Sequence, residues 1–176
     1  MVAWIATAII LLTVPVSIAV AYLFDETDSL ENAFEPVFVS CEVQGEFEKD
    51  AQSNIAVKNT GDIHAYVRVF LLVTWVSDTD GSVYAGNPQK NTDYTLTAQS
   101  ANWSLGNDGF YYYKKSVYAN GVTDTLIGEI TEISQAPDGY SLTVQVFASA
   151  IQANPPRAVE ETWGITVSEN GELVAP

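Results

Sequence analysis

Apolar and polar residues alternate along most of the chain after residue 33. A period of two places successive side chains on opposite faces of a β-strand, so this pattern predicts a sheet protein. The clearest stretch runs from Ala65 to Trp75, and Tyr140 to Ala150 repeats it. We expect these two stretches to be central strands. Further strands are predicted at three shorter alternating runs, which are Val37 to Val43, Ile55 to Val57 and Ile165 to Val167.

Turn-forming dipeptides separate the predicted strands. Asn or Asp followed by Gly tolerates the positive φ of tight hairpin turns, and such pairs occur at Asp80-Gly81, Asp108-Gly109, Asn120-Gly121, Asp138-Gly139 and Asn170-Gly171. Because the strands are not separated by long stretches of helical period, we expect an all-β fold, an antiparallel two-sheet sandwich. Residues 155–164 start with prolines and end with Gly164, which predicts one short helix that inserts Trp163 into one end of the sandwich.

The N-terminal segment has the character of an export signal. Residues 2–24 contain no charged side chain, and their apolar run is long enough to enter a membrane. Ala19 and Ala21 form the pattern of small residues that a signal peptidase requires, which predicts cleavage before Tyr22. No basic residue precedes the apolar run. For that reason an uncleaved membrane anchor stays open as the alternative, as does a true start upstream of Met1.

The predicted layout has three parts: a signal peptide or anchor in 1–21, an acidic linker in 22–32, and a β-sandwich domain in 33–176. The chain has 7 basic and 22 acidic residues, a net charge of -15 and an isoelectric point near 4.1. Such a negative field repels phosphate backbones, so we expect no nucleic-acid partner. From the export signal we expect an extracellular or cell-surface location. Cys41, the single cysteine, lies in an alternating run that predicts a buried, inert thiol.

Few residues have the types and spacing of a catalytic or metal site. His64 is the sole histidine, which excludes the H-E-x-x-H zinc pattern, and we expect it to face solvent at a strand start. Asp78 and Asp80 precede Gly81 and are weak candidates for a surface calcium site, although a hairpin tip explains them equally. The sequence leaves open whether two of the many carboxylates form a glycosidase pair. No catalytic residue and no cofactor is predicted.

An aromatic run at 110–115 has two interpretations. Phe110 and three consecutive tyrosines precede Lys114 and Lys115. Exposed rings at these positions would form a stacking platform for a glycan. Strands also favour tyrosine, and alternate side chains of a strand would point into the core. We therefore expect a strand.

Short motifs along the chain resemble those of a known family. Residues 19–25, AVAYLFD, are followed by 31–36, ENAFEP, and residues 58–69, KNTGDIHAYVRV, form a turn that leads into a long strand. These stretches, with 150–153 and 158–164, are similar to those of the SipW-dependent exported proteins of Gram-positive bacteria, the group of TasA and camelysin.

The resemblance implies a jelly-roll sandwich. For the TasA branch it also implies a biofilm-matrix fibre, in which an N-terminal strand of one subunit completes the sheet of the next by main-chain hydrogen bonds to an open edge. The expected partners are further copies of the chain, other matrix or cell-wall components, and signal peptidase during export. The residues expected in the donated strand are Tyr22, Leu23, Phe24, Phe34 and Val37.

Two other functions stay open beside this structural one. Camelysin is described as a metalloprotease, so the resemblance also implies a secreted peptidase, but one histidine without ligand spacing favours a protein that is not an enzyme. The third is a monomeric surface adhesin or binding module that holds a glycan or calcium at residues 110–113 or at its acidic loops.

Overall fold

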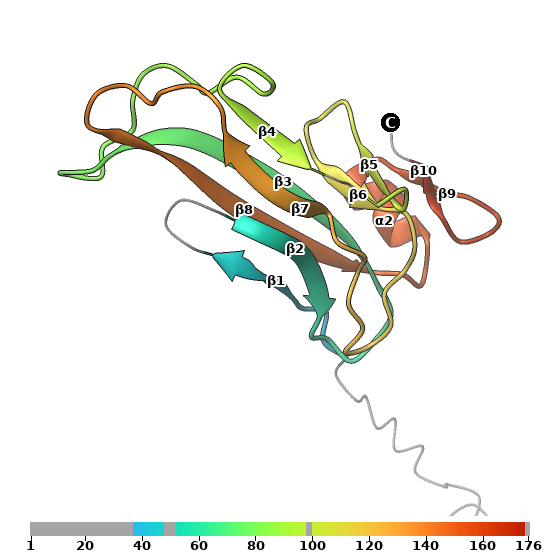
Figure 1. Cartoon of the computed structure of the whole chain (residues 1–176). Helices are drawn as coiled ribbons and strands as arrows, with labels where there is room; N and C mark the ends of the chain where they lie inside the picture. Colours follow the sequence, from blue (N-terminus) through green and yellow to red (C-terminus); the bar gives the residue numbers. More distant parts are fainter. Residues whose placement is uncertain (1–36, 48–51, 98–99, 175–176) are drawn as a thin grey trace, which may run out of the picture. The chain divides into compact units, whose positions relative to one another are not determined.

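The computed structural model describes residues 37–47, 52–97 and 100–174. Within these ranges the chain forms ten β-strands and one α-helix (Figure 1). No helix of the described part has the length and hydropathy needed to cross a bilayer. Several predictions fall on residues outside this part: the signal peptide with Ala19, Ala21 and Tyr22, the linker 22–32, and the donor residues Tyr22, Leu23, Phe24 and Phe34.

Two four-stranded antiparallel sheets make up most of the described domain (Figure 1). The first has the strand order β1-β2-β7-β4 and the second has the order β5-β6-β3-β8. A two-stranded sheet, β9 with β10, and the helix α2 follow at the C-terminal end of the chain. The bounds are β1 Cys41–Phe47, β2 Gln52–Asn59, β3 Ala65–Ser77, β4 Tyr94–Thr97, β5 Trp103–Leu105, β6 Tyr111–Tyr113, β7 Ile127–Glu132, β8 Tyr140–Gln152, α2 Arg157–Trp163, β9 Thr166–Val167 and β10 Leu173–Val174.

One apolar core joins the two large sheets. Ile55 and Val57 of β2 are fully buried against Val67 and Val69 of β3 in the same cluster. β8 adds alternate residues to this core, which are Leu142, Val144, Val146, Ala148 and Ala150. Burying one aliphatic side chain of this size stabilises a fold by about 1.5–3 kcal/mol, so the alternation decides which face of each strand turns inward. The predicted antiparallel β-sandwich is confirmed.

A second, smaller core lies on the outer face of the β5-β6-β3-β8 sheet. Tyr66 of β3 and Tyr112 of β6 point away from the main core and are buried under Val159, Ile165 and Leu173. Those three residues come from α2 and from the chain around β9 and β10. As a result β6 is covered on both faces, and all three of its tyrosines are buried. The sequence alternation did not indicate this extra layer.

The predicted helix is present, but its tryptophan lies elsewhere than expected. α2 ends at Gly164, which has φ 69°, and the Gly164 N–H donates to the Glu160 carbonyl. Glycine suits this left-handed helix end because it has no Cβ. Trp163 packs beside Tyr112, with ring centroids 6.0 Å apart, on the outer face of the second sheet. The prediction that Trp163 closes one end of the sandwich is wrong, because the apolar outer face of β3 and β6 offered a larger surface to cover.

The predicted strands are mostly found, with two corrections. β3 is an inner strand of its sheet, but β8 is the last in its sheet, so the prediction that Tyr140 to Ala150 is central is wrong. The run predicted from Val37 becomes a strand only at Cys41. Four of the five predicted turn glycines have positive φ, namely Gly81, Gly109, Gly139 and Gly171, whereas in the fifth pair Asn120 takes it instead.

Candidate functional site

β8 is a long strand at the edge of the second sheet. All 13 residues of β8 pair with β3 in one unbroken antiparallel register, from Tyr140↔Ser77 to Gln152↔Ala65. Within the described residues, no second strand pairs with the other side of β8. A sheet edge of this length presents a row of main-chain donors and acceptors to whatever approaches it.

The sequence of β8 carries none of the residues that usually protect an edge. It reads YSLTVQVFASAIQ and contains no charged residue, no proline and no glycine. Charges, proline and bulges on an edge strand keep other chains from pairing with it. β8 therefore has the properties of an acceptor for a further strand.

The remaining edges of the two large sheets are protected or short. β1 carries Glu42 and Glu46, and its pairing with β2 is interrupted by a register shift between Gln44 and Glu46. β4 has 4 residues and β5 has 3. Charged residues, an irregular register and short length each weaken pairing with an added strand. The contrast singles out β8 as the edge where strand addition is least hindered.

The ladder between β3 and β8 shows which main-chain groups of β8 point outward. The Ala153 N–H donates to the His64 carbonyl at 2.9 Å, one step beyond the Ala65↔Gln152 pair. Hydrogen-bonded pairs alternate along an antiparallel ladder, so Ser149 and every second residue from it direct their N–H and C=O groups toward β3. Val146, Ala148 and Ala150 consequently direct theirs away from β3. Their side chains, in contrast, pack against the core.

An apolar strip on the outer face of the second sheet runs beside this edge. Phe147 of β8 is 52% exposed and faces Phe70 of β3 in the register. The Phe70 ring lies 5.4 Å from that of Phe110, and Leu72 is exposed next along β3. A strand added at β8 would extend this face, so Phe147 would gain a neighbour on the side where none of the described strands pairs with β8.

Arg68 is held between aromatic rings where this strip meets the C-terminal layer. Its guanidinium carbon lies 4.2 Å from the centroid of Phe110 and 4.8 Å from that of Trp163. Its Nε donates to Ser149 Oγ at 3.1 Å. Stacking on two rings and a hydrogen bond hold the side chain in one position. Arg68 thereby joins β3 and β8 to the helix α2, which is a structural role.

The two calcium candidates lie in the turn after β3, and both are exposed. Asp78 Oδ1 accepts a hydrogen bond from Ser141 Oγ at 2.6 Å. Asp80 Oδ1 accepts from the N–H and from the hydroxyl of Ser82, and these bonds, with that of the Ser77 hydroxyl, lower the pKa of Asp80 to about 2. The described residues contain no group of three or more His, Cys, Asp or Glu side chains placed to hold a metal ion.

The other residues singled out in the sequence have ordinary surroundings. His64 is exposed just before β3, as predicted. Cys41 is only partly buried, and the loss of hydration raises the pKa of its thiol. Val37 is exposed. Tyr111–Tyr113 form a buried strand, which confirms the strand interpretation of the aromatic run.

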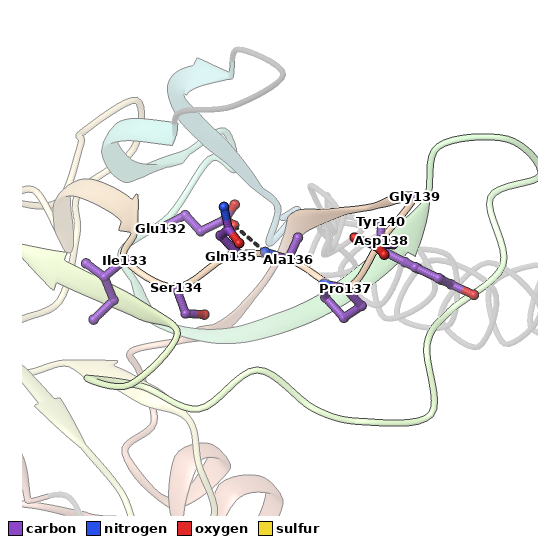
Figure 2. Close-up of a pocket in the computed structure, with 9 residues that line it drawn as sticks. All are labelled: Glu132, Ile133, Ser134, Gln135, Ala136, Pro137, Asp138, Gly139 and Tyr140. Atoms are coloured by element: carbon purple, nitrogen blue, oxygen red, sulfur yellow. Dashed lines mark hydrogen bonds between the residues drawn. The ribbon is translucent and has the colours of Figure 1, made fainter.

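The described residues also form an open hollow that the sequence did not indicate. Residues 132–140, the loop from β7 to β8, curve around a volume of about 530 Å³ (Figure 2). Glu132 Oε1 accepts a hydrogen bond from the Ala136 N–H at 3.1 Å across the loop. A hollow lined by a single short loop leaves no spacing signal in the sequence. It buries little of any ligand, so we assign no chemistry to it.

The β8 edge was also missed, because alternation reports which face of a strand is buried and not how many neighbours the strand has. The absence of charge from 140–152 fits a central strand as well as an edge strand, so it did not distinguish the two. The chain matches no protein-family model, no curated protein and no solved structure, so its function is argued from its own residues and geometry.

Proposed function

We propose that this protein is an exported structural subunit of an extracellular matrix or cell-surface fibre, and that copies join when a strand of one adds to β8 of the next. The observation that carries the proposal is the uncharged, uninterrupted edge of β8. The resemblance to SipW-dependent exported proteins supports the same role, and under it the sandwich would have jelly-roll connectivity. Matrix or cell-wall components are the proposed further partners.

The free energy of such an assembly comes from main-chain hydrogen bonds and from apolar contacts. Each hydrogen bond formed at the edge contributes about 0.5–1.5 kcal/mol net. An added strand would bond to the outward groups of Val146, Ala148 and Ala150 and would cover the exposed ring of Phe147. Several bonds in a row are needed to offset the entropy lost when an extended segment is ordered. The outward groups of Val146, Ala148 and Ala150 would supply such a row.

The proposed donor is the segment that precedes the domain, with Tyr22, Leu23, Phe24, Phe34 and Val37 as its apolar residues. The structure limits where this segment ends. The Phe38 carbonyl accepts a hydrogen bond from the Asp62 N–H at 3.0 Å within its own domain. Residues from Phe38 onward are therefore committed to that domain, and a donated strand must lie before them.

Electron microscopy of four versions of the chain tests this proposal. Ala148→Pro removes an outward N–H that β3 does not use, so the fold is retained while an incoming strand loses a donor. Ala148→Ser keeps that N–H and is the matched control. We expect filaments from the unchanged chain and from Ala148→Ser, and few or none from Ala148→Pro. Filaments from a chain that lacks residues 22–32 would show that the donor assignment is wrong.

The peptidase implied by camelysin makes a different prediction. Cleavage of casein by the purified protein, lost when a chelator is added, would replace the structural role with an enzymatic one. Monomers at every concentration, with no cleavage, would favour the adhesin. Its candidate binding surface would be the exposed ring of Phe147 on the outer face of the second sheet. The same preparation thus distinguishes all three functions.

A further inference from the structure

Exposed apolar side chains gather at the end of the sandwich where Val37 enters the domain. Phe38 is 61% exposed and Tyr118 is 63% exposed, although both are aromatic. Scattered exposed apolar residues are normal, but a group of them marks a contact surface. We call this group the apolar pole; its members are Val37, Phe38, Val39, Tyr118 and Val122.

Asn59 holds the segments of the apolar pole together, and it is fully buried. Its backbone N–H donates to the Gly121 carbonyl at 2.9 Å, and its side-chain Nδ2 donates to the Tyr118 carbonyl at 3.2 Å. The Asp62 N–H, in the same turn as Asn59, donates to the Phe38 carbonyl. The turn from β2 to β3 and the chain between β6 and β7 meet at this end (Figure 1). Hydrogen bonds therefore hold the backbone that carries the exposed rings of Phe38 and Tyr118.

The charge at this end differs from that of the whole chain. The pole and its flanking residues, segments 37–42, 58–64 and 114–124, hold three lysines, Lys58, Lys114 and Lys115, and three acids, Glu42, Asp62 and Asp124. The whole chain has a net charge of -15. Glu42 lies opposite Lys58 in the β1-β2 ladder, and Asp124, whose pKa is lowered chiefly by hydrogen bonds from Asn102 and Ser100, also lies near Lys115. The charges at this end therefore balance, so phosphate groups repel it less than the net charge of the whole chain would suggest.

The sequence before the domain indicates what the pole faces. Residues 2–24 carry no charge, and 12 residues, 25–36, separate them from Val37. A fully extended chain of that length spans about 40 Å. If residues 2–24 occupy a bilayer, as expected during export or in an anchored form, the tether joins the domain at Val37, which belongs to the apolar pole.

We propose that the apolar pole is a membrane-contact surface, which inserts the rings of Phe38 and Tyr118 into the headgroup region of a zwitterionic bilayer. Aromatic side chains with a polar tip suit that region, and aliphatic neighbours add buried area. The inference rests on the export part of the proposed function and not on fibre assembly.

A dye that reports its surroundings tests the pole in the full chain. It is attached to a single cysteine in a Cys41→Ala background, at residue 118 by Tyr118→Cys or at residue 83 by Val83→Cys. Val83 is the matched control because it is 62% exposed and follows β3, at the opposite end of that strand from Ala65. Each labelled chain is mixed with phosphatidylcholine vesicles, with or without brominated acyl chains, and its association is measured by co-flotation.

We expect the dye at residue 118 to shift its emission to the blue and to be quenched by brominated lipid, and the dye at residue 83 to do neither. Equal responses at the two positions, or no co-flotation, would overturn the proposal. Blue emission at residue 118 before vesicles are added would also overturn it, because protein, from the same copy or a second one, would then cover the pole. Filaments are scored separately without vesicles, so failure of fibre assembly is distinguished from failure of membrane contact.

Discussion

The side-chain amide of Asn59 donates a hydrogen bond to the Val117 carbonyl at 2.9 Å, although the two residues lie 58 positions apart. The same Nδ2 group bonds to the Ile63 and Tyr118 carbonyls, and the Asn59 Oδ1 accepts from the Gly61 N–H. One buried amide side chain thus forms hydrogen bonds with main-chain groups of both the turn from β2 to β3 and the chain after β6.

Asn59→Ala should destabilise the domain strongly. The substitution removes the side-chain partner of the Gly61 N–H and of the Ile63 carbonyl, whereas the Val117 and Tyr118 carbonyls keep their bonds from the Ala65 and Gly121 N–H groups. Each buried group costs about 1–3 kcal/mol when it stays unpaired. We expect the free energy of unfolding in urea to fall by about 2–4 kcal/mol. Thr60→Ala, at the exposed neighbouring position, is the control and should change it by less than about 0.5 kcal/mol. Similar values for the two variants would contradict the role given to Asn59.

Gly61→Ala tests how closely the chain before β1 passes this turn. A Cβ at Gly61 would approach the Phe38 carbonyl oxygen and would lie 2.9 Å from the Ser40 nitrogen, both of which are backbone atoms. Backbone has little room to move, so we expect a loss of about 1–3 kcal/mol in unfolding free energy. Gly86→Ala is the control, because its nearest atoms belong to the Tyr84 side chain. A neutral Gly61→Ala would mean that residues 38–40 are displaced at little cost.

The Arg68 stack predicts a difference between two arginines. Arg68→Met removes the guanidinium from the rings of Phe110 and Trp163 and should lower stability by about 1–2 kcal/mol. Arg157→Met breaks only an exposed ion pair with Glu161 and should change stability by less than about 1 kcal/mol. Hydrogen exchange of β9 and β10 should accelerate in Arg68→Met alone. Equal exchange in both variants would show that Arg68 does not secure the C-terminal layer.

The turn after β3 predicts a dependence of stability on pH. The folded-state pKa of Asp80 is about 2, below its ordinary value of 3.8, mainly because the Ser82 N–H donates to the ionised carboxylate. A lowered pKa stabilises the folded state above pH 3.8, and this contribution is lost as the pH falls through about 2. Asp80→Asn should therefore lower the Tm well above pH 3.8 and leave it unchanged below pH 2. A Tm difference that stays constant across this range would contradict the assignment.

The sequence predicted those elements that one apolar face, or a local signal at a helix end, is enough to identify. The alternation of apolar residues from Ala65 to Trp75 identifies β3 and its core-facing side. A shift of one residue in the pairing register of this strand would turn its whole apolar set toward the opposite face. The helix at 157–163 was also predictable, since proline before it and glycine after it act locally. Local signals of this kind need no knowledge of the neighbouring strands.

Features that depend on neighbours could not be predicted. Tyr66 and Tyr112 lie on the face expected to be mixed or exposed, yet a layer from the C-terminal part of the chain buries them. The pattern from Tyr140 to Ala150 predicts a central strand, because one face is apolar and the other is uncharged. An edge strand that accepts a further strand has the same pattern. The candidate site, β8, thus has the sequence pattern of a central strand but lies at the edge of its sheet.

Hydrogen exchange at single amides of β8 tests strand addition most directly, with dispersed chain compared against assembled fibres. The amides of Val146, Ala148 and Ala150 point away from β3 and should exchange fast in the dispersed chain and slowly in the fibre. The Ser149 amide points toward β3 and should be protected in both states. Fibres in which the amides of Val146, Ala148 and Ala150 still exchange as fast as in the dispersed chain would contradict assembly through this edge.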